Sequence, residues 1–181
     1  AYLDPIEVDT RQFRLGDPGL AAVYYLQTSP ESAMKRMLAA GAPSIYSIGP
    51  VFRAGEQGDH HNTEFTMLEW YDVGADMAGA VSLLGALSDQ ILGGRHQIRT
   101  YRELFRQSLG LDPMDEPLGA LFAHAMKIDS QLATSISEDR DGLLELLFSR
   151  LIQPTLGAER PLIVTHYPLT QAALAKQAVD D

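Results

Sequence analysis

The most informative stretch of this chain runs from Val51 to Tyr71 and reads VFRAGEQGDHHNTEFTMLEWY. One strand, expected over Ser44–Phe52, leads into it, and a second, expected over Glu64–Val73, closes it. The second strand alternates in polarity, so its side chains project to two faces: Phe65, Met67, Glu69 and Tyr71 to one, and Thr66, Leu68 and Trp70 to the other. We therefore predict an antiparallel pair joined by a loop of about eleven residues, a length that is usually functional.

Glu69 and Tyr71 are two polar residues that we expect on the inner face of the second strand. A buried carboxylate is costly without a partner, so Glu69 either forms an internal ion pair or faces water at an edge. The alternative is a pocket for a cationic ligand, with charge from Glu69 and a ring and hydroxyl from Tyr71. Glu31, in the first turn of a predicted helix, either stabilises the helix dipole or holds an ammonium group in that pocket. Spacing alone does not decide.

Polar residues of the loop suggest an anion site rather than a metal site. Arg53 stands where the first strand ends, and a guanidinium there can clamp a phosphate through two parallel hydrogen bonds. The alternative is a surface arginine paired with Glu56. His60 and His61 are adjacent on an extended chain and point opposite ways, so a shared metal ion is not expected. Asn62, taken alone, is a typical turn residue.

The remaining segments predict an α+β fold in a single domain, residues 1–181. Short strands are expected at Val23–Gln27 and, as a buried strand, at Pro161–His166. Short helices and loops are expected over Leu111–Glu138. Longer helices are expected from Pro30 (after a hydroxyl residue) to Gly41, over Met77–Leu92, from a capping box of Thr100 and Glu103 to Leu109, over Gly142–Leu156, and briefly from Thr170.

Composition excludes several classes of protein. The chain has 181 residues and a formal net charge of −10, and its 14 Lys and Arg are dispersed, which argues against tight nucleic-acid binding. It contains no cysteine, so disulfides and thiolate chemistry are excluded. No stretch of about 18 apolar residues and no signal peptide are visible. We therefore expect a cytoplasmic protein without a membrane span.

The stretch from Val51 to Tyr71 resembles the second signature motif of class II aminoacyl-tRNA synthetases, in its lysine-specific form. The segment YYLQTSPESAMKRMLAAG resembles the region before that motif. Met-Lys-Arg and Ala-Ala-Gly in that segment, LEWY in the second strand, and HYPLTQAALAK near the end are most similar to one branch. That branch comprises the lysyl-tRNA-synthetase-like enzymes that lack an anticodon-binding domain and attach lysine to elongation factor P.

The resemblance implies an antiparallel sheet flanked by helices, in the manner of class II synthetases. It implies ATP- and Mg²⁺-dependent activation of lysine, or a lysine analogue, to an aminoacyl-adenylate, followed by transfer to a lysine of elongation factor P. Two alternatives stay open: a lysyl-tRNA synthetase core that charges tRNA, and a non-catalytic paralogue that binds a ligand or partner. The acidic charge balance and LEWY favour the protein acceptor over tRNA.

Roles for individual residues also follow from the motif match. Arg53 is implied to be catalytic, holding the α-phosphate and stabilising charge as pyrophosphate leaves. The implied ATP-binding residues are Arg53, Glu56, His61, Asn62 and Phe65, with Phe65 stacked on the adenine. The implied substrate-binding residues are Ser29, Glu31, which would bind the α-ammonium, and Glu69 and Tyr71, which would shape the lysine side-chain pocket.

Some features depart from the family pattern. Thr63 stands where proline is usual, and Asp59 where a basic residue is common, so we expect a more mobile loop and weaker ATP binding. The first signature motif, which builds the family's dimer interface, is expected before Ala1, and the third after Asp181. We therefore expect a partial catalytic domain that does not complete adenylation alone. A homodimer stays open for the full-length protein.

Overall fold

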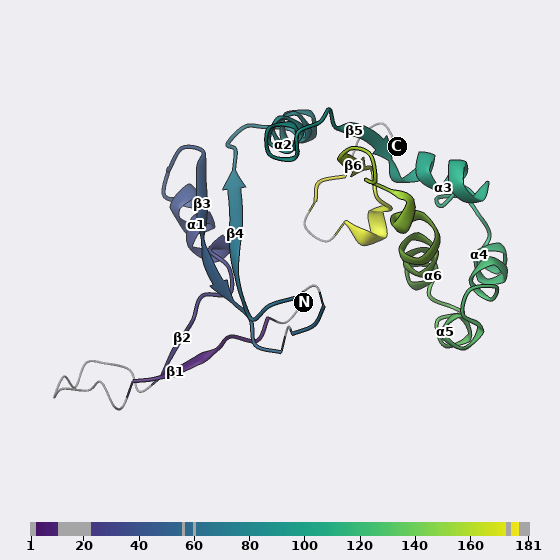
Figure 1. Ribbon diagram of the computed structural model, residues 1–181, viewed down its shortest axis with the longest axis horizontal. Helices are drawn as coiled ribbons and strands as arrows, with labels where there is room; N and C mark the ends of the chain where they lie inside the picture. Colours follow the sequence, from purple (N-terminus) through teal and green to yellow (C-terminus); the bar gives the residue numbers. More distant parts are fainter. Residues whose placement is uncertain (1–2, 11–22, 56, 60, 173–174, 178–181) are drawn as a thin grey trace. The chain divides into compact units, whose positions relative to one another are not determined.

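A computed structural model describes residues 3–10, 23–55, 57–59, 61–172 and 175–177. Two residues of the predicted loop, Glu56 and His60, lie outside this description. The chain divides into two compact units, Ala1–Asp76 and Met77–Asp181, and each is described by itself (Figure 1).

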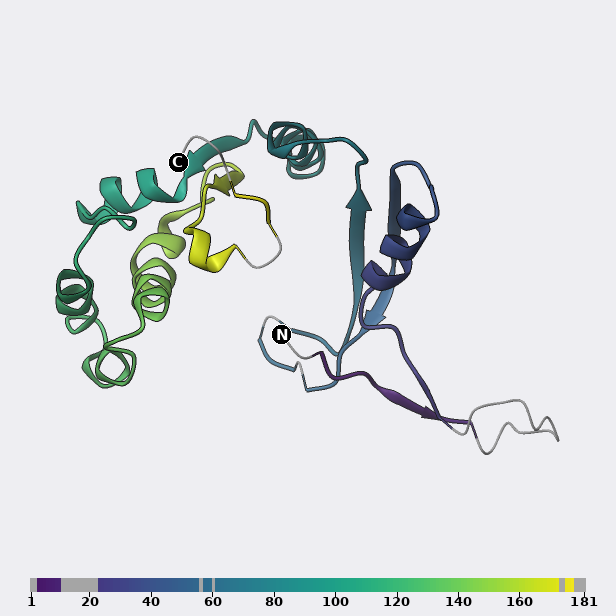
Figure 2. The same cartoon turned by 180° about the vertical axis from the view of Figure 1, so that it is seen from behind.

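The first unit is built on a β-hairpin with one helix against it. Its elements are β1 (Glu7–Asp9), β2 (Val23–Tyr25), α1 (Glu31–Ala39), β3 (Ile45–Phe52) and β4 (Glu64–Tyr71). β1 pairs antiparallel with β2, and β3 with β4. The register runs from Ile45 opposite Tyr71 to Phe52 opposite Glu64, which confirms the predicted antiparallel pair. Figure 2 shows β3 and β4 side by side with α1 alongside them.

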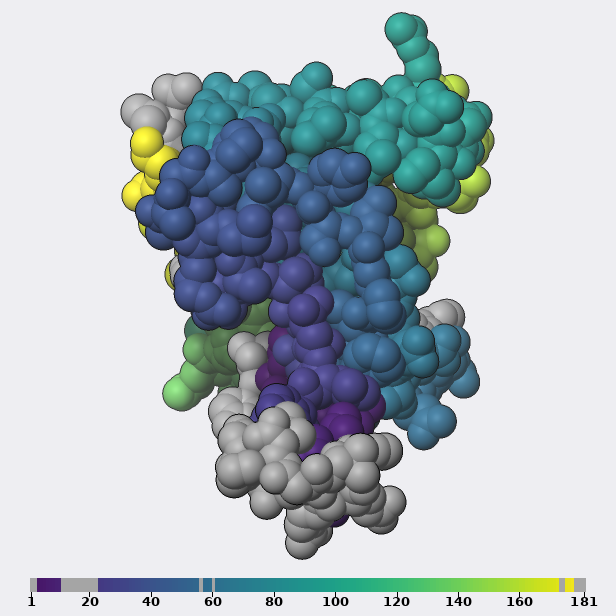
Figure 3. Space-filling model, turned by 90° about the vertical axis from the view of Figure 1, so that its left-hand side faces the viewer, coloured from purple at the N-terminus to yellow at the C-terminus, as the bar shows by residue number. Residues whose placement is uncertain are grey.

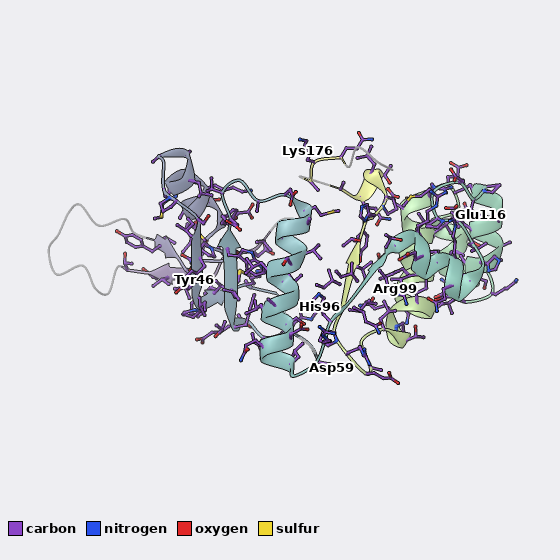
Figure 4. The ribbon with its side chains drawn as sticks, turned by 90° about the horizontal axis from the view of Figure 1, so that it is seen from above. Tyr46, Asp59, His96, Arg99, Glu116 and Lys176 are labelled. Atoms are coloured by element: carbon purple, nitrogen blue, oxygen red, sulfur yellow. The ribbon has the colours of Figure 1, made fainter. Side chains whose placement is uncertain are left out.

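The two faces of this hairpin differ in burial, as the alternation predicts. Val51 is 1% exposed on one face, and Met34 of α1 is 5% exposed. On the opposite face Tyr46, labelled in Figure 4, is 74% exposed. Ile48 on the same face is 63% exposed. The face that carries Glu69 and Tyr71 is therefore the better covered one.

The helix α1 begins one residue later than its sequence signal predicts. Pro30 occupies the N-cap and Glu31 is the first helical residue, so the hydroxyl of Ser29 lies one position before the cap. That hydroxyl still accepts a hydrogen bond from the backbone N–H of Glu31, at 3.1 Å. It thereby satisfies one of the backbone donors that a helix start leaves without an internal partner.

The second unit is mainly helical. Its elements are α2 (Met77–Leu92), β5 (Gln97–Thr100), α3 (Tyr101–Leu109), α4 (Leu118–Ala125), α5 (Ser130–Ser135), α6 (Arg140–Leu147) and β6 (Leu162–Thr165), with a short 3-10 turn at Leu169–Gln171. The bounds of α2 and the capping box of Thr100 and Glu103 are confirmed. Buried residues of α3, α4 and α6 form the core, and Tyr101 stacks on Phe148 with ring centroids 5.1 Å apart.

The single helix predicted over Gly142–Leu156 is wrong in its second half. After α6 the backbone widens into a π-helical turn, Phe148–Ile152, and then tightens into a 3-10 turn, Gln153–Thr155. Pro154 contributes to this change because it has no N–H to donate. The apolar spacing of leucines therefore continues past the end of the regular α-helix.

The strand pair of the second unit also differs from expectation. β5 was not predicted, and it pairs with β6 in parallel, from Gln97 opposite Leu162 to Thr100 opposite Thr165. β6 was expected to be buried, but among its four residues only Thr165 is fully buried. Two strands alone cover little of each other's side chains, so the remaining residues stay half-buried.

Candidate functional site

The side chain of Ser29 links the start of α1 to the carboxylate of Glu69 on β4. The hydroxyl of Ser29 donates a hydrogen bond to Oε1 of Glu69 and accepts one from the N–H of Glu31. Ser29, Glu31 and Glu69 are all half-buried. A hydrogen bond to an ionised carboxylate is strong and directional. Ser29 therefore fixes the orientation of Glu69 next to the first turn of the helix that carries Glu31.

A lysine outside the residues selected from the sequence joins this cluster. Nζ of Lys35 forms an ion pair with Oε1 of Glu31, one helical turn away, and the two side chains are 50% and 47% exposed. The hydrogen bond that Lys35 donates to Glu31 raises the pKa of Lys35, burial lowers it, and the charges of Glu31, Tyr71 and Glu69 raise it further. The spacing of four residues between Glu31 and Lys35 is the signal that could have identified the pair.

Tyr71 completes the cluster on the same face of β4. Its burial raises the pKa of the hydroxyl, and the negative charges of Glu31 and Glu69 raise it further, while Lys35 acts in the opposite direction. Tyr71 lies two residues after Glu69 on β4, so the two side chains project from the same face of the strand. The structure thus brings together the four residues predicted to bind the substrate: Ser29, Glu31, Glu69 and Tyr71.

Arg53 lies at the other end of the strand pair, over an aromatic ring. Its guanidinium carbon is 5.2 Å from the ring centroid of Phe65, which is within the range of a cation–π interaction. Its Nε donates to the backbone carbonyl of Thr28 at 3.4 Å. The segment before α1 and the strand pair therefore both position this guanidinium, and the contact brings together two residues predicted to bind ATP.

The loop residues are placed differently. His61 and Asn62 are exposed. Asp59 is exposed as well (Figure 4). Thr63 supplies only its backbone carbonyl, which accepts from the N–H of Arg53 at 2.9 Å. Because proline has the same carbonyl, the exchange at position 63 keeps this link.

Among the described residues no group of three or more His, Cys, Asp or Glu side chains is arranged to hold a metal ion. No described helix is both long enough and apolar enough to cross a bilayer.

Comparison with known proteins identifies the family. Residues 4–181 match the family model described as tRNA synthetases class II (D, K and N). The chain belongs to this family. Curated relatives of this class II chain include proteins named elongation factor P–(R)-β-lysine ligase. The protein from Yersinia enterocolitica is 42% identical over 173 residues, which cover 94% of the chain and 53% of the relative.

Two further relatives carry the same name. The protein from Sodalis glossinidius is 40% identical over 158 residues, covering 87% of this chain and 49% of its own length. The protein from Photorhabdus laumondii is 40% identical over 179 residues, covering 97% of this chain and 55% of its own length. The class II chain therefore spans about half the length of the curated relatives that it matches.

Proposed function

We propose that the full-length protein carrying this chain uses ATP to activate (R)-β-lysine as an aminoacyl-adenylate and transfers it to a lysine of elongation factor P. The names of its relatives supply the substrate and the acceptor. The observation that carries the proposal is the cluster of Ser29, Glu31, Glu69 and Tyr71, because it offers two carboxylates to a substrate with two amino groups.

The carboxylates of this cluster favour a substrate that carries positively charged amino groups. Glu69, held by Ser29, meets the distal ammonium with the hydroxyl of Tyr71 beside it, and Glu31 meets the amine nearer the carboxyl group. Hydrogen bonds between charged partners contribute about 1.5–3 kcal/mol each. A neutral amino acid of the same size forms fewer of these bonds and binds more weakly.

Arg53 acts at the phosphate end. In activation, an oxygen of the substrate carboxylate bonds to the α-phosphorus of ATP, the bond to the bridging oxygen breaks, and pyrophosphate leaves. The guanidinium of Arg53 offsets the negative charge that gathers in this transition state. Its position over Phe65 fits a site where an adenine ring also lies against an aromatic side chain.

Transfer completes the reaction. The ε-amine of the acceptor lysine attacks the carbonyl carbon of the adenylate, the bond to the phosphate oxygen breaks, and AMP and a proton leave. The family uses Mg²⁺ with ATP, but the described residues present no set of three carboxylate or imidazole ligands for an ion. We therefore assign the ion no ligand in this chain and no step of the reaction.

We further propose that residues 1–181 form part of one catalytic domain and that the two antiparallel strand pairs of the first unit belong to one sheet. Backbone hydrogen bonds support this for the first unit, because they continue between the two strand pairs. The N–H of Phe52 donates to the carbonyl of Gln27 at 2.8 Å, and that of Ala54 to the carbonyl of Asp4 at 2.8 Å. A homodimer of the full-length protein stays a prediction that light scattering would test.

The proposal is tested with the full-length protein and two competing acceptors. Purified elongation factor P and lysine tRNA are offered together with ATP and (R)-β-lysine, and each product is measured by mass spectrometry. We expect modification of the protein acceptor and little charging of tRNA. Preferential tRNA charging would support the lysyl-tRNA synthetase alternative. Absence of both products, together with absence of adenylate, would support a non-catalytic paralogue.

A further inference from the structure

We propose that Lys35 is a placeholder: its ammonium group occupies the site of a substrate amine on Glu31 until the substrate displaces it. The inference rests on the proposed function, and it assigns a specificity-setting role to a residue that has none in that proposal. It predicts that Lys35 weakens substrate binding by competing for Glu31.

The position of Lys35 on α1 supports this role. Glu31 and Lys35 lie one turn apart on α1, and Lys35 is exposed. In the space-filling view α1 lies at the surface of its unit (Figure 3). The ammonium of Lys35 pairs with Glu31, the carboxylate that the proposed substrate amine would use. The charges of Glu69 and Tyr71 contribute more weakly to the raised pKa of Lys35.

Charge is the second argument. Glu31 and Glu69 bring two negative charges to the proposed site, and the ammonium of Lys35 offsets one of them. Ser29 gives Glu69 a hydrogen-bond donor, whereas the donor for the side chain of Glu31 is Lys35. An internal ammonium therefore keeps the empty site neutral enough to stay formed, and it presents the same chemical group as the ligand.

The Glu31–Lys35 ion pair is weak enough for a substrate to displace it. Both side chains of the Glu31–Lys35 pair are about half exposed. An exposed pair four residues apart on a helix changes an equilibrium constant by only about twofold. A substrate amine with a second anchor on Glu69 can displace such a weak partner, which a buried ion pair would not allow.

The experiment measures the KM for (R)-β-lysine in ATP–pyrophosphate exchange by the full-length protein. We expect Lys35→Met to lower KM by about twofold. Lys35→Arg should raise it by about twofold, because arginine holds a carboxylate with two hydrogen bonds. Lys35→Gln is a second neutral variant in case the first does not fold. Arg36→Met, on the next residue of α1, is the matched control for loss of charge.

A second ligand separates competition from general electrostatics. 6-Aminohexanoate has the distal amine but lacks the amine assigned to Glu31, so its inhibition constant should change less than KM in Lys35→Met. If Lys35→Met and Lys35→Gln raise KM or leave it unchanged, or if Arg36→Met lowers KM equally, the placeholder role is wrong.

The proposed function and this role fail separately. If the wild type catalyses no exchange, the proposed activity is wrong, and calorimetric titration with L-lysine alone then tests the placeholder. Tighter binding in Lys35→Met than in the wild type would support it. Equal, weaker or undetectable binding in both proteins would overturn it.

Discussion

Ser29 shows how one small side chain organises the proposed amine site. Its hydroxyl reaches Glu69 on β4 and the backbone of Glu31 on α1, two elements far apart in the sequence. The alternation of β4 predicted that Glu69 and Tyr71 share a face, and the structure confirms it. The link through Ser29 could not be derived from periodicity, because it depends on how α1 packs against the hairpin.

At Glu69 we expect Glu69→Gln to raise the KM for (R)-β-lysine by tenfold or more, as roughly 1.5–3 kcal/mol of charged hydrogen bonding is lost. Pyrophosphate exchange by the full-length protein measures this. Glu64→Gln is the matched control, because Glu64 lies on the same strand but is exposed on the other face. Equal effects of the two substitutions would remove Glu69 from the site.

Replacing Arg53 by lysine keeps the positive charge but removes the planar guanidinium group, which can donate two parallel hydrogen bonds. Arg53→Lys should lower kcat by about 10²–10³-fold, since a lysine ammonium cannot reproduce two parallel hydrogen bonds to phosphate. Single-turnover formation of the adenylate is the measurement. Arg36→Lys, on exposed α1, should change kcat little. A decrease of only a few-fold in Arg53→Lys would contradict the assigned role.

Side-chain contacts between different helices and strands could not be predicted from the sequence patterns. His96, just before β5, lies against α2 (Figure 4), and its Nδ1 is 3.0 Å from both carboxylate oxygens of Asp89. Burial works against ionisation of Asp89, but the hydrogen bonds from His96 prevail and lower its pKa. Such contacts join residues of different elements, so no single periodic pattern carries them.

The close packing of His96 against Gly85 of α2 can be tested by substitution. A Cβ at Gly85 would lie 2.4 Å from the imidazole of His96, so Gly85→Ala should lower the free energy of unfolding by about 1–3 kcal/mol. Gly119→Ala on α4, where no atom lies within 4 Å, should instead stabilise by about 0.5–1 kcal/mol. Urea unfolding of both variants checks this; the same sign in both would refute the contact.

The connection between α3 and α4 contains a network of ion pairs around Asp112. The guanidinium nitrogens of Arg102 donate hydrogen bonds of 2.6–3.0 Å to the carboxylate oxygens of Asp112, and Arg106 donates a further one. The hydrogen bond from Arg102, opposed by burial and supported by Arg106, lowers the pKa of Asp112 from 3.8 to about 2. Because this carboxylate has a lower pKa in the folded state, it stabilises the fold fully above about pH 4.

That stabilisation should be lost as the pH falls from about 4 towards 2. Asp112→Asn should lower the free energy of unfolding at pH 7 by about 1–2 kcal/mol and flatten its dependence on pH in this window. Denaturant titrations at several pH values measure both effects. Asp115→Asn, whose side chain is 76% exposed, should change stability by less than about 0.5 kcal/mol.

Sequence patterns predicted regular elements well and their ends less well. α2 and β4 have strong signals: sixteen residues with apolar spacing and a Gly-Gly stop, and a clear period of two. The failures have physical causes. Ser29 and Pro30 look like a cap and first turn, yet the cap is Pro30. β5, with only four residues, is too short for alternation to separate it from a loop.

At the scale of the whole molecule the core is unevenly divided between the two units. The buried hydrophobic core cluster belongs entirely to the second unit. In the first unit the described buried hydrophobic residues are Met34 and Val51. Since buried apolar area supplies most of the stabilisation of a fold, the second unit holds most of the chain's intrinsic stability.

This division predicts different behaviour for the two halves when they are produced separately. Residues 77–181 should unfold in a cooperative thermal transition, whereas residues 1–76 should not. Circular dichroism during heating measures both. Ile91 and Leu92 of α2 are each 67% exposed, so we also expect the 77–181 fragment to bind a hydrophobic dye. A cooperative transition in residues 1–76 alone would contradict this distribution of stability.

We propose that the residues at the start of α1 and on β4 bind a lysine-type substrate, which ATP adenylates while Arg53 offsets the developing negative charge. The most direct test is ATP–pyrophosphate exchange by the full-length protein with (R)-β-lysine, compared with 6-aminohexanoate. We expect exchange that depends on (R)-β-lysine and is at least tenfold slower with 6-aminohexanoate, because one charged contact is lost. Exchange at equal rates with both compounds, or with neither, would contradict the claim.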